Sequence, residues 1–373
     1  MTRRGLRYYP IEVARRLRHY AEKRLYGYAD RGTLAEAAAS ILAERAANGF
    51  RAGGHFQGVW PRDLCFAAPG LVASGLGDEL RVTTEGLVER VAESGTFYTD
   101  FHDGFEAATP AEGVDTFPAL VVLLDETGGI DPHGDAVAAL AEFHRRKFFD
   151  PGSGIVDGAG SAWWDSAADP REAYNTAMLL TALERLAERG VETAYAGWGS
   201  AIREGLSGLW NGRFFDEARG SSVLACDANV VPLYFGLVGD RRAERIVGAL
   251  DDLRTEHGLR MRERPFSYGE VHPYFLLHRD YHDGVWPWNS FMYANGLVRY
   301  GFDGRAEREV ERVERRLRPY GTFLEALAPD GTAYERRGYA SAEDFTVAAA
   351  LWTEYRVRTG RPPDSIAADG APS

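Results

Sequence analysis

Apolar positions recur at helical spacing along nearly the whole chain of 373 residues, and the breaks between periodic stretches fall at Gly, Pro and Asp. The strict alternation of a β-strand is hard to find. The spacing predicts ten helices, over residues 10–26, 63–75, 79–93, 115–127, 134–148, 193–209, 229–237, 241–256, 287–300 and 304–318.

Three further helices are predicted by N-terminal capping boxes, in which a side-chain oxygen accepts from a free backbone amide and an acidic residue reaches back. Thr33-Leu34-Ala35-Glu36 opens an alanine-rich helix that ends near Gly49. Asp169-Pro170-Arg171-Glu172 and Ser341-Ala342-Glu343-Asp344 have the same form. The chain is therefore expected to contain roughly a dozen helices.

The connections between these helices are alternately short and long. Helices joined in this way most simply form hairpins packed around an axis. We therefore predict an all-α fold, a double-layered (α/α)6 toroid of about twelve helices. Its long Gly- and Trp-rich connections would emerge at one end and build a pocket, and they span residues 94–114, 150–169, 257–286 and 319–341. No repeat with a period of 20 to 50 residues is visible, which disfavours a solenoid.

Composition narrows the class of protein. Hydrophobic residues make up 45% of the chain and aromatic residues 12%, enough for a large packed core. The net charge of -12 argues against nucleic acid as a partner, because phosphate binding needs a surplus of Lys and Arg. Cys65 and Cys226 lie in apolar segments and are expected to be free buried thiols.

The location of the protein is predicted from the absence of a membrane span and of a secretory signal in the sequence. No run approaches about 18 apolar residues, so no membrane span is expected. The start of the chain does not continue into the apolar stretch of a secretory signal, and we expect a cytoplasmic protein. The oligomeric state stays open.

Three segments, far apart in the chain, combine acids with aromatic rings. They are Trp163-Trp164-Asp165, the segment from Tyr281 to Trp288, and Gly321-Thr322-Phe323-Leu324-Glu325-Ala326-Leu327. A sugar-cleaving site needs two carboxyl groups for proton transfer and flat rings to hold the sugar. The residues therefore favour a glycosidase with an oligosaccharide or polysaccharide as its partner.

Short motifs add a resemblance to a known family. Gly58-Val59-Trp60-Pro61-Arg62-Asp63 resembles the Trp-x-Arg-Asp segment of glycogen-debranching amylo-1,6-glucosidases, and bacterial glucoamylases carry a similar one. Further segments resemble the family in the same order: Val114-Asp115-Thr116, Trp164-Asp165-Ser166, Glu172-Ala173-Tyr174-Asn175-Thr176-Ala177, Tyr281 to Trp288, and Gly321 to Glu325. The resemblance covers roughly residues 50 to 355. It implies the (α/α)6 fold of the six-hairpin glycosidases, with residues 1–360 as one catalytic domain. The segment after Gly360 contains Pro362, Pro363 and small residues, so residues 361–373 are expected to form a disordered tail.

The resemblance implies an exo-acting, inverting α-glucosidase that acts on the ends of an α-glucan or of malto- and isomalto-oligosaccharides. Cleavage of α-1,6 bonds is favoured, and glucoamylase-like α-1,4 cleavage is the alternative. Asp165 would be the general acid and Glu325 the general base. Inverting enzymes hold these two carboxyls about 6.5–9.5 Å apart.

A set of further residues is expected to bind the sugar, because charged pairs grip hydroxyls and rings stack on sugar faces. They are Trp60, Arg62, Asp63, Trp164, Glu172, Asn175, His282, Trp286 and Trp288. Each has a structural alternative: the Arg-Asp pair can cap a helix, tryptophans are mostly core residues, and a capping box explains Glu172. No cofactor is implied, and the histidines are too scattered to predict a metal site.

Two other classes of protein stay open. A sugar epimerase or a polysaccharide lyase of the same fold would use His or Tyr as proton carriers, which would make His55, His272 or His282 essential. A non-catalytic carbohydrate- or protein-binding toroid would leave the acids dispersed and expose an apolar patch in their place.

Overall fold

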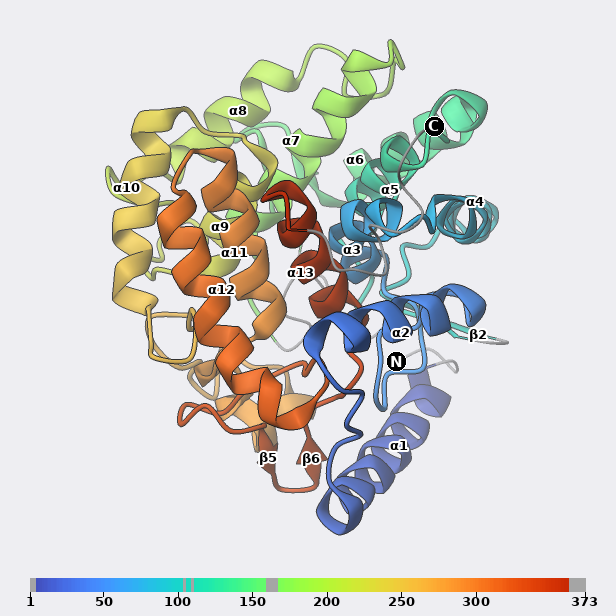
Figure 1. The fold of residues 1–373 in the computed structure, drawn as a ribbon. Helices are drawn as coiled ribbons and strands as arrows, with labels where there is room; N and C mark the ends of the chain where they lie inside the picture. The colour runs from blue at the N-terminus through green and yellow to red at the C-terminus, as the bar shows by residue number, and fades with distance from the viewer. Residues whose placement is uncertain (1–4, 103–104, 109–110, 159–166, 362–373) are drawn as a thin grey trace, which may run out of the picture.

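The computed structural model describes residues 5–102, 105–108, 111–158 and 167–361, and it contains thirteen α-helices within them (Figure 1). Six helices pack side by side in a closed inner ring: α3 (Pro61–Ala73), α5 (Thr116–Glu126), α7 (Glu172–Glu188), α9 (Cys226–Phe235), α11 (Pro287–Arg299) and α13 (Thr346–Arg358). Because α13 packs on α3, the ring has no free edge.

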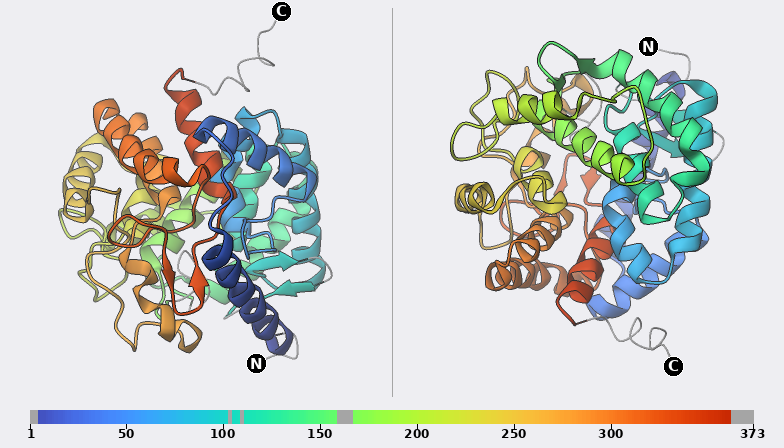
Figure 2. Two further views of the ribbon diagram at one scale, coloured as in Figure 1. Left: turned by 60° about the horizontal axis from the view of Figure 1, so that its bottom comes forward. Right: turned by 90° about the horizontal axis from the view of Figure 1, so that it is seen from above.

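Six more helices pack on the outside of this ring: α2 (Leu34–Ala47), α4 (Gly77–Ser94), α6 (Gly134–Phe148), α8 (Gly199–Gly208), α10 (Asp240–Leu250) and α12 (Asp303–Leu317). The expected (α/α)6 toroid is confirmed. Helix α1 (Gly5–Tyr26) belongs to neither ring and packs beside the β5–β6 hairpin (Figure 2, left).

Short elements lie in the connections. The strands form three two-stranded antiparallel sheets, which pair β1 (Asp100–His102) with β2 (Phe105–Ala107), β3 (Phe149–Asp150) with β4 (Ile155–Val156), and β5 (Glu335–Arg336) with β6 (Tyr339–Ala340). The 3-10 helices are η1 (Asp131–His133), η2 (Asp251–Leu253), η3 (Pro273–Asp283) and η4 (Arg318–Tyr320).

The hydrophobic pattern of each helix explains the ring it joins. Every residue from Thr116 to Leu124 of α5 is buried, as suits a helix that has neighbours on all sides. In α12, the apolar residues Ala306, Val310, Val313 and Leu317 are buried at helical spacing while its other face is charged. An all-round apolar helix is thus placed inside and an amphipathic one outside.

One glycine allows the inner ring to close. A Cβ on Gly70 of α3 would lie 2.0 Å from the backbone oxygen of Ala350 in α13, far inside van der Waals contact. Only a residue without a side chain lets these two helices approach so closely.

All long connections precede inner helices, so they gather at the end of the toroid where the inner helices begin. Hydrogen bonds confirm that these helix starts are neighbours. Arg62 in the first turn of α3 donates to Asp115 at the start of α5, and Arg171 at the start of α7 donates to Asp227 in α9. The described parts of the long connections therefore gather at this end, as predicted, and the candidate site lies there.

The capping predictions are right once and wrong twice. Thr33 and Glu36 form the predicted box, with the Thr33 oxygen accepting from the Glu36 amide. Helix α7 begins at Glu172 and α13 at Thr346, and neither has a side-chain cap. Glu172 instead forms an ion pair across the loop, and the segment before α13 is held by contacts with distant residues, so tertiary partners replaced the local caps.

Cys65 and Cys226 are free and buried, as expected, and burial raises the pKa of both thiols. None of the helices in the described ranges is both long and apolar enough to cross a membrane.

Candidate active site

Glu325 is enclosed at the open end of the toroid, with 3% of its surface exposed. Its carboxylate accepts three hydrogen bonds: from the Tyr281 hydroxyl on Oε1, and from the Tyr339 hydroxyl (2.7 Å) and the Ala342 amide (3.1 Å) on Oε2. Burial raises the pKa of Glu325, and these three donors together with the charge of Arg16 oppose the rise because they favour the ionised form.

Aromatic rings continue from this carboxylate in two directions. On one side Tyr281 lies against Trp286, with ring centroids 4.8 Å apart, and Trp286 lies 5.7 Å from Trp288. The Trp286 ring nitrogen donates to the backbone oxygen of Tyr281 at 3.2 Å. One face of Trp288 stacks on Phe66 of the core. Trp286 and Trp288 are therefore connected to Glu325 through the Tyr281 ring.

The other direction leads to Trp60. The Tyr339 ring contacts His55, His55 contacts Phe56, and Phe56 meets Trp60 edge-on at 5.3 Å. Trp60 and Glu325 are 265 positions apart in sequence but belong to one continuous belt of rings. Flat faces of this kind are what carbohydrate pockets use.

His55 is an unusual member of this belt. It is 4% exposed, and neither ring nitrogen has a hydrogen-bond partner. Burial, and then the nearby charge of Arg16, lower its pKa well below 6.5, so the ring is neutral at physiological pH. A buried polar group without a partner is uncommon and marks a position that a ligand can satisfy.

Arg62 and Asp63, predicted to grip sugar hydroxyls, lie in the first turn of α3. Arg62 is buried, and its Nε donates to Asp115 Oδ2 at 2.6 Å; the Tyr174 hydroxyl donates to the same oxygen at 2.7 Å. Asp63 is half-buried. The arginine thus helps to tie α3, α5 and α7 together at the site end.

A second charged cluster joins α7 and α9 to the connection before α11. Arg171 contacts Asp227 and Glu217, and Arg262 donates to Glu217 and Glu270. Although burial pushes the pKa of Glu217 up, its two arginines dominate and lower it to about 2. Arg171 and Arg262 of this cluster lie over the Phe266 ring, which in turn contacts His282.

His282, Glu172 and Asn175 are all buried. Burial lowers the pKa of His282 to about 3, so the ring is neutral, and it meets Trp286 at 5.6 Å. Glu172 Oε2 accepts from the Arg219 amide at 2.7 Å, and Oε1 accepts from the Arg219 guanidinium, so both carboxylate oxygens are engaged. Neither end of the Asn175 amide has a hydrogen-bond partner.

Asp165 and Trp164 lie outside the described residues, so the distance between Asp165 and Glu325 stays a prediction. Asp283 is a third acid in this region, besides Asp165 and Glu325. Burial and the charge of Asp280 raise the pKa of Asp283 to about 6. Asp283 lines a separate groove of about 450 Å³ together with Arg254 and Arg260. It is two residues from Tyr281, but Glu325 is not among the residues that line its groove.

Three side chains around Glu325 were missed by the sequence reasoning as site residues: Tyr281, Tyr339 and Arg16. Tyr281 was named only as the first residue of a motif, and Tyr339 and Arg16 stand in no motif at all. A hydroxyl that meets a carboxylate 14 or 44 positions away leaves no local signal in the sequence.

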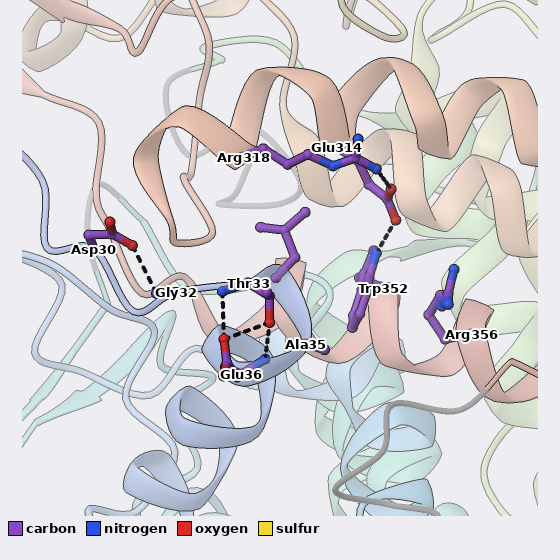
Figure 3. A pocket seen from close by; sticks show the side chains of 10 residues that line it. Asp30, Gly32, Thr33, Ala35, Glu36, Glu314, Arg318, Trp352 and Arg356 are labelled. Carbon is purple, nitrogen blue, oxygen red and sulfur yellow. Dashed lines mark hydrogen bonds and ion pairs between the residues drawn. The ribbon is translucent and has the colours of Figure 1, made fainter.

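A groove of about 720 Å³ between α2, α12 and α13 is distinct from this site (Figure 3). Its polar groups are bonded to one another: the Trp352 ring nitrogen donates to Glu314 at 2.8 Å, Arg318 pairs with the same carboxylate, and Thr33 and Glu36 cap α2. Its chemistry is structural, which leaves the loop end as the candidate site.

A ring of inner and outer helices with the long loops gathered at one end is the fold of the (α/α)6 glycosidases. One similar structure is a glycosidase, in a variant with one glutamate replaced by alanine, in complex with glucose. The two chains are 15% identical, with a TM-score of 0.64, over 88% of this chain and 97% of that one.

Two further structures are similar. One is a rhamnosidase from Klebsiella oxytoca with rhamnose bound (15% identity, TM-score 0.62, 89% of this chain and 65% of that one). The other is a GH63 mannosylglycerate hydrolase from Thermus thermophilus in complex with Tris and D-glycerate (15%, 0.61, 87% and 100%). At this level of identity the likeness establishes the fold. No protein-family profile and no curated protein sequence matches the chain.

Proposed function

We propose that the protein is a glycoside hydrolase: an inverting, exo-acting α-glucosidase that cleaves terminal glucose from α-glucan or oligosaccharide ends, with α-1,6 bonds preferred. The observation that carries the proposal is Glu325, a single enclosed carboxylate held by Tyr281, Tyr339 and a backbone amide inside a belt of aromatic rings. The fold shared with glycosidases of several substrates supports it.

The geometry of Glu325 suits a general base. An ionised carboxylate offers about four acceptor positions, and three are occupied. In the proposed reaction the remaining one, on Oε1, would accept from the attacking water. Glu325 would take a proton from this water as its oxygen attacks the anomeric carbon, while Asp165 gives a proton to the leaving oxygen on the opposite face. The product would be β-glucose from an α-glucoside.

The test is a substrate panel read by proton NMR, which reports both turnover and the anomer first released. Isomaltose, panose, maltose and maltotriose separate the α-1,6 from the α-1,4 alternative, and a rhamnoside and mannosylglycerate probe the substrates of the structural neighbours. Glu325→Gln and Asp165→Asn should each lower kcat by about 10²–10⁴-fold. Glu335→Gln, in the same loop but half-buried away from the carboxylate cage, is the matched control. Full turnover in both site variants would refute the mechanism, and α-glucose as first product would refute inversion.

A sugar epimerase or lyase of the same fold is the second candidate, and His55 favours it. Its unpartnered ring, packed at 5.1 Å on the Tyr339 ring, would be a proton carrier in such a reaction. His55→Gln decides between the two. Under the hydrolase proposal, His55→Gln changes mainly KM. The alternative would be favoured if the wild type releases no reducing sugar from any α-glucoside and His55→Gln abolishes turnover of an epimerase or lyase substrate.

A further inference from the structure

Helix α1 braces the segment that holds Glu325, although it belongs to neither ring of the toroid. Its His19 Nε2 lies 3.1 Å from the backbone oxygen of Ser341, and its Lys23 forms an ion pair with Glu343. These two contacts flank Ala342, whose amide donates to Glu325. Helix α1 and the β5–β6 hairpin therefore run beside each other as one unit (Figure 2, left).

Arg16 extends from α1 to the rings around the carboxylate. Its guanidinium carbon lies 5.5 Å from the centroid of the Tyr339 ring and 5.5 Å from that of the Phe275 ring, both within the range of a cation–π contact. The hydroxyl of the same Tyr339 donates to Glu325. The Tyr339 ring thus lies between the positive charge of Arg16 and the carboxylate of Glu325. Arg16 is half-buried, so solvent screens its charge less than at the surface.

Titratable and charged groups face Glu325 or its tyrosines from four elements. They are Arg16 and His19 of α1, His278, Asp280 and Tyr281 of η3, His55 of the loop before α3, and Tyr334 and Tyr339 of the loop of Glu325 itself. Burial, together with nearby positive charge, lowers the pKa of His19, His55 and His278, so these rings are neutral at physiological pH. Asp280 is engaged by Arg336 and Tyr334.

We propose that Arg16 is a positioning residue of the active site, which holds the Tyr339 ring against Glu325 and places a positive charge beside the base. The inference rests on the proposed function, because it assigns Glu325 the role of base. It makes α1 part of the active site, a role that its place outside both rings does not suggest.

The test compares Arg16→Gln with Arg16→Lys and with Arg18→Gln. Arg18 is the matched control: it lies on the same helix, carries the same charge, and pairs with Glu22 at the exposed surface. The readout is the pH profile of kcat/KM. For Arg16→Gln we expect the acid limb to move to higher pH, with a loss of about tenfold on the acid side and less than about twofold on the plateau. Arg16→Lys, which keeps the charge, should restore most of the profile, and Arg18→Gln should leave it unchanged.

An equal loss at all pH values in Arg16→Gln, or the same loss in Arg18→Gln, would overturn the inference and leave α1 a structural support. A second measurement separates this failure from failure of the proposed function. The carboxyl infrared band assigned by difference to Glu325, using Glu325→Gln, is titrated in the wild type and in Arg16→Gln without any substrate. A band that titrates at higher pH in Arg16→Gln keeps the inference even if no tested glycoside is hydrolysed, and an unmoved band overturns it even if glycosides are hydrolysed.

Discussion

Replacing Tyr339 by Phe removes one hydroxyl from the carboxylate cage and leaves the ring in place. The Tyr339 hydroxyl donates to Glu325 Oε2 at 2.7 Å, and a hydrogen bond to a charged group contributes about 1.5–3 kcal/mol. The Ala342 amide still donates to the same oxygen, so the lower end of that range applies. About 1.4 kcal/mol is a factor of ten in an ionisation equilibrium, so ionisation of Glu325 becomes roughly tenfold harder.

The direction of the change in the pKa of Glu325 depends on which form of the carboxyl group the Tyr339 hydroxyl stabilises. Tyr339 donates to the ionised carboxylate, so its loss raises the pKa of Glu325, in the same direction as burial already does. At a given acidic pH a smaller fraction of the base is ionised. The acid limb of the kcat/KM profile therefore moves to higher pH in Tyr339→Phe, while the alkaline limb, assigned to the general acid, stays in place.

The assay is a pH series of kcat/KM with the best substrate of the panel, with Tyr334→Phe as the matched control. Tyr334 lies in the same loop, 5.8 Å from Tyr339 between ring centroids, and its hydroxyl donates to Asp280 at 3.0 Å instead of Glu325. We expect the control to keep the wild-type acid limb. An unmoved limb in Tyr339→Phe, or an equal movement in Tyr334→Phe, would show that the cage does not control the ionisation of the base.

The other predictions concern stability and the identity of the acid. Gly70→Ala should destabilise the fold by about 1–3 kcal/mol or more, because the new Cβ would lie 2.0 Å from a backbone oxygen. Gly86→Ala in α4 has open space around it and should stabilise the fold by up to about 1 kcal/mol. Chemical denaturation measures both changes. Thr33→Ala should cost about 1 kcal/mol in the same measurement because it removes the cap of α2. Glu217→Gln should lower the free energy of unfolding by about 3 kcal/mol at neutral pH. The pKa of Glu217 is about 2 in the folded protein and ordinarily 4.5, so the difference in free energy between variant and wild type should shrink as the pH falls from 4.5 towards 2. A difference that stays constant with pH would contradict the ion-pair explanation. Asp283→Asn should leave turnover within about threefold, since neither Glu325 nor its tyrosines line the groove of Asp283. A loss as large as that of Asp165→Asn would make Asp283 the general acid instead.

The fold was predictable because its signals are local. Ten periodic stretches and three capping boxes predicted thirteen helices, and each has its counterpart in the structure, although only the Thr33 box forms as a cap. The alternation of short and long connections predicted both the toroid and the end at which the loops gather. The two failed capping boxes mark the limit of such signals: in the segments before α7 and α13 side chains bond distant loops instead, which a four-residue pattern cannot show.

The candidate site was predictable only in part. The rings of Trp60, Trp286 and Trp288 were found through motifs, and they do lie in one belt with Glu325. Arg62 lies at the end of the toroid where the inner helices begin, and it donates to Asp115, a contact that the motif did not predict. The hydroxyls of Tyr281 and Tyr339 were missed, because a tyrosine in a loop is common and nothing near it in sequence says that it meets a carboxylate.

The sequence by itself therefore determined the class of fold, the end of the toroid where the long connections gather, and the acid most worth testing, since helical period and acid-aromatic motifs are properties of neighbouring residues. Only the tertiary structure decided what surrounds that acid. The donors to Glu325, the charge of Arg16 and the use of α1 as a brace depend on contacts between residues tens to hundreds of positions apart. Such contacts exist only once the ring has closed and the loops have been brought to one end.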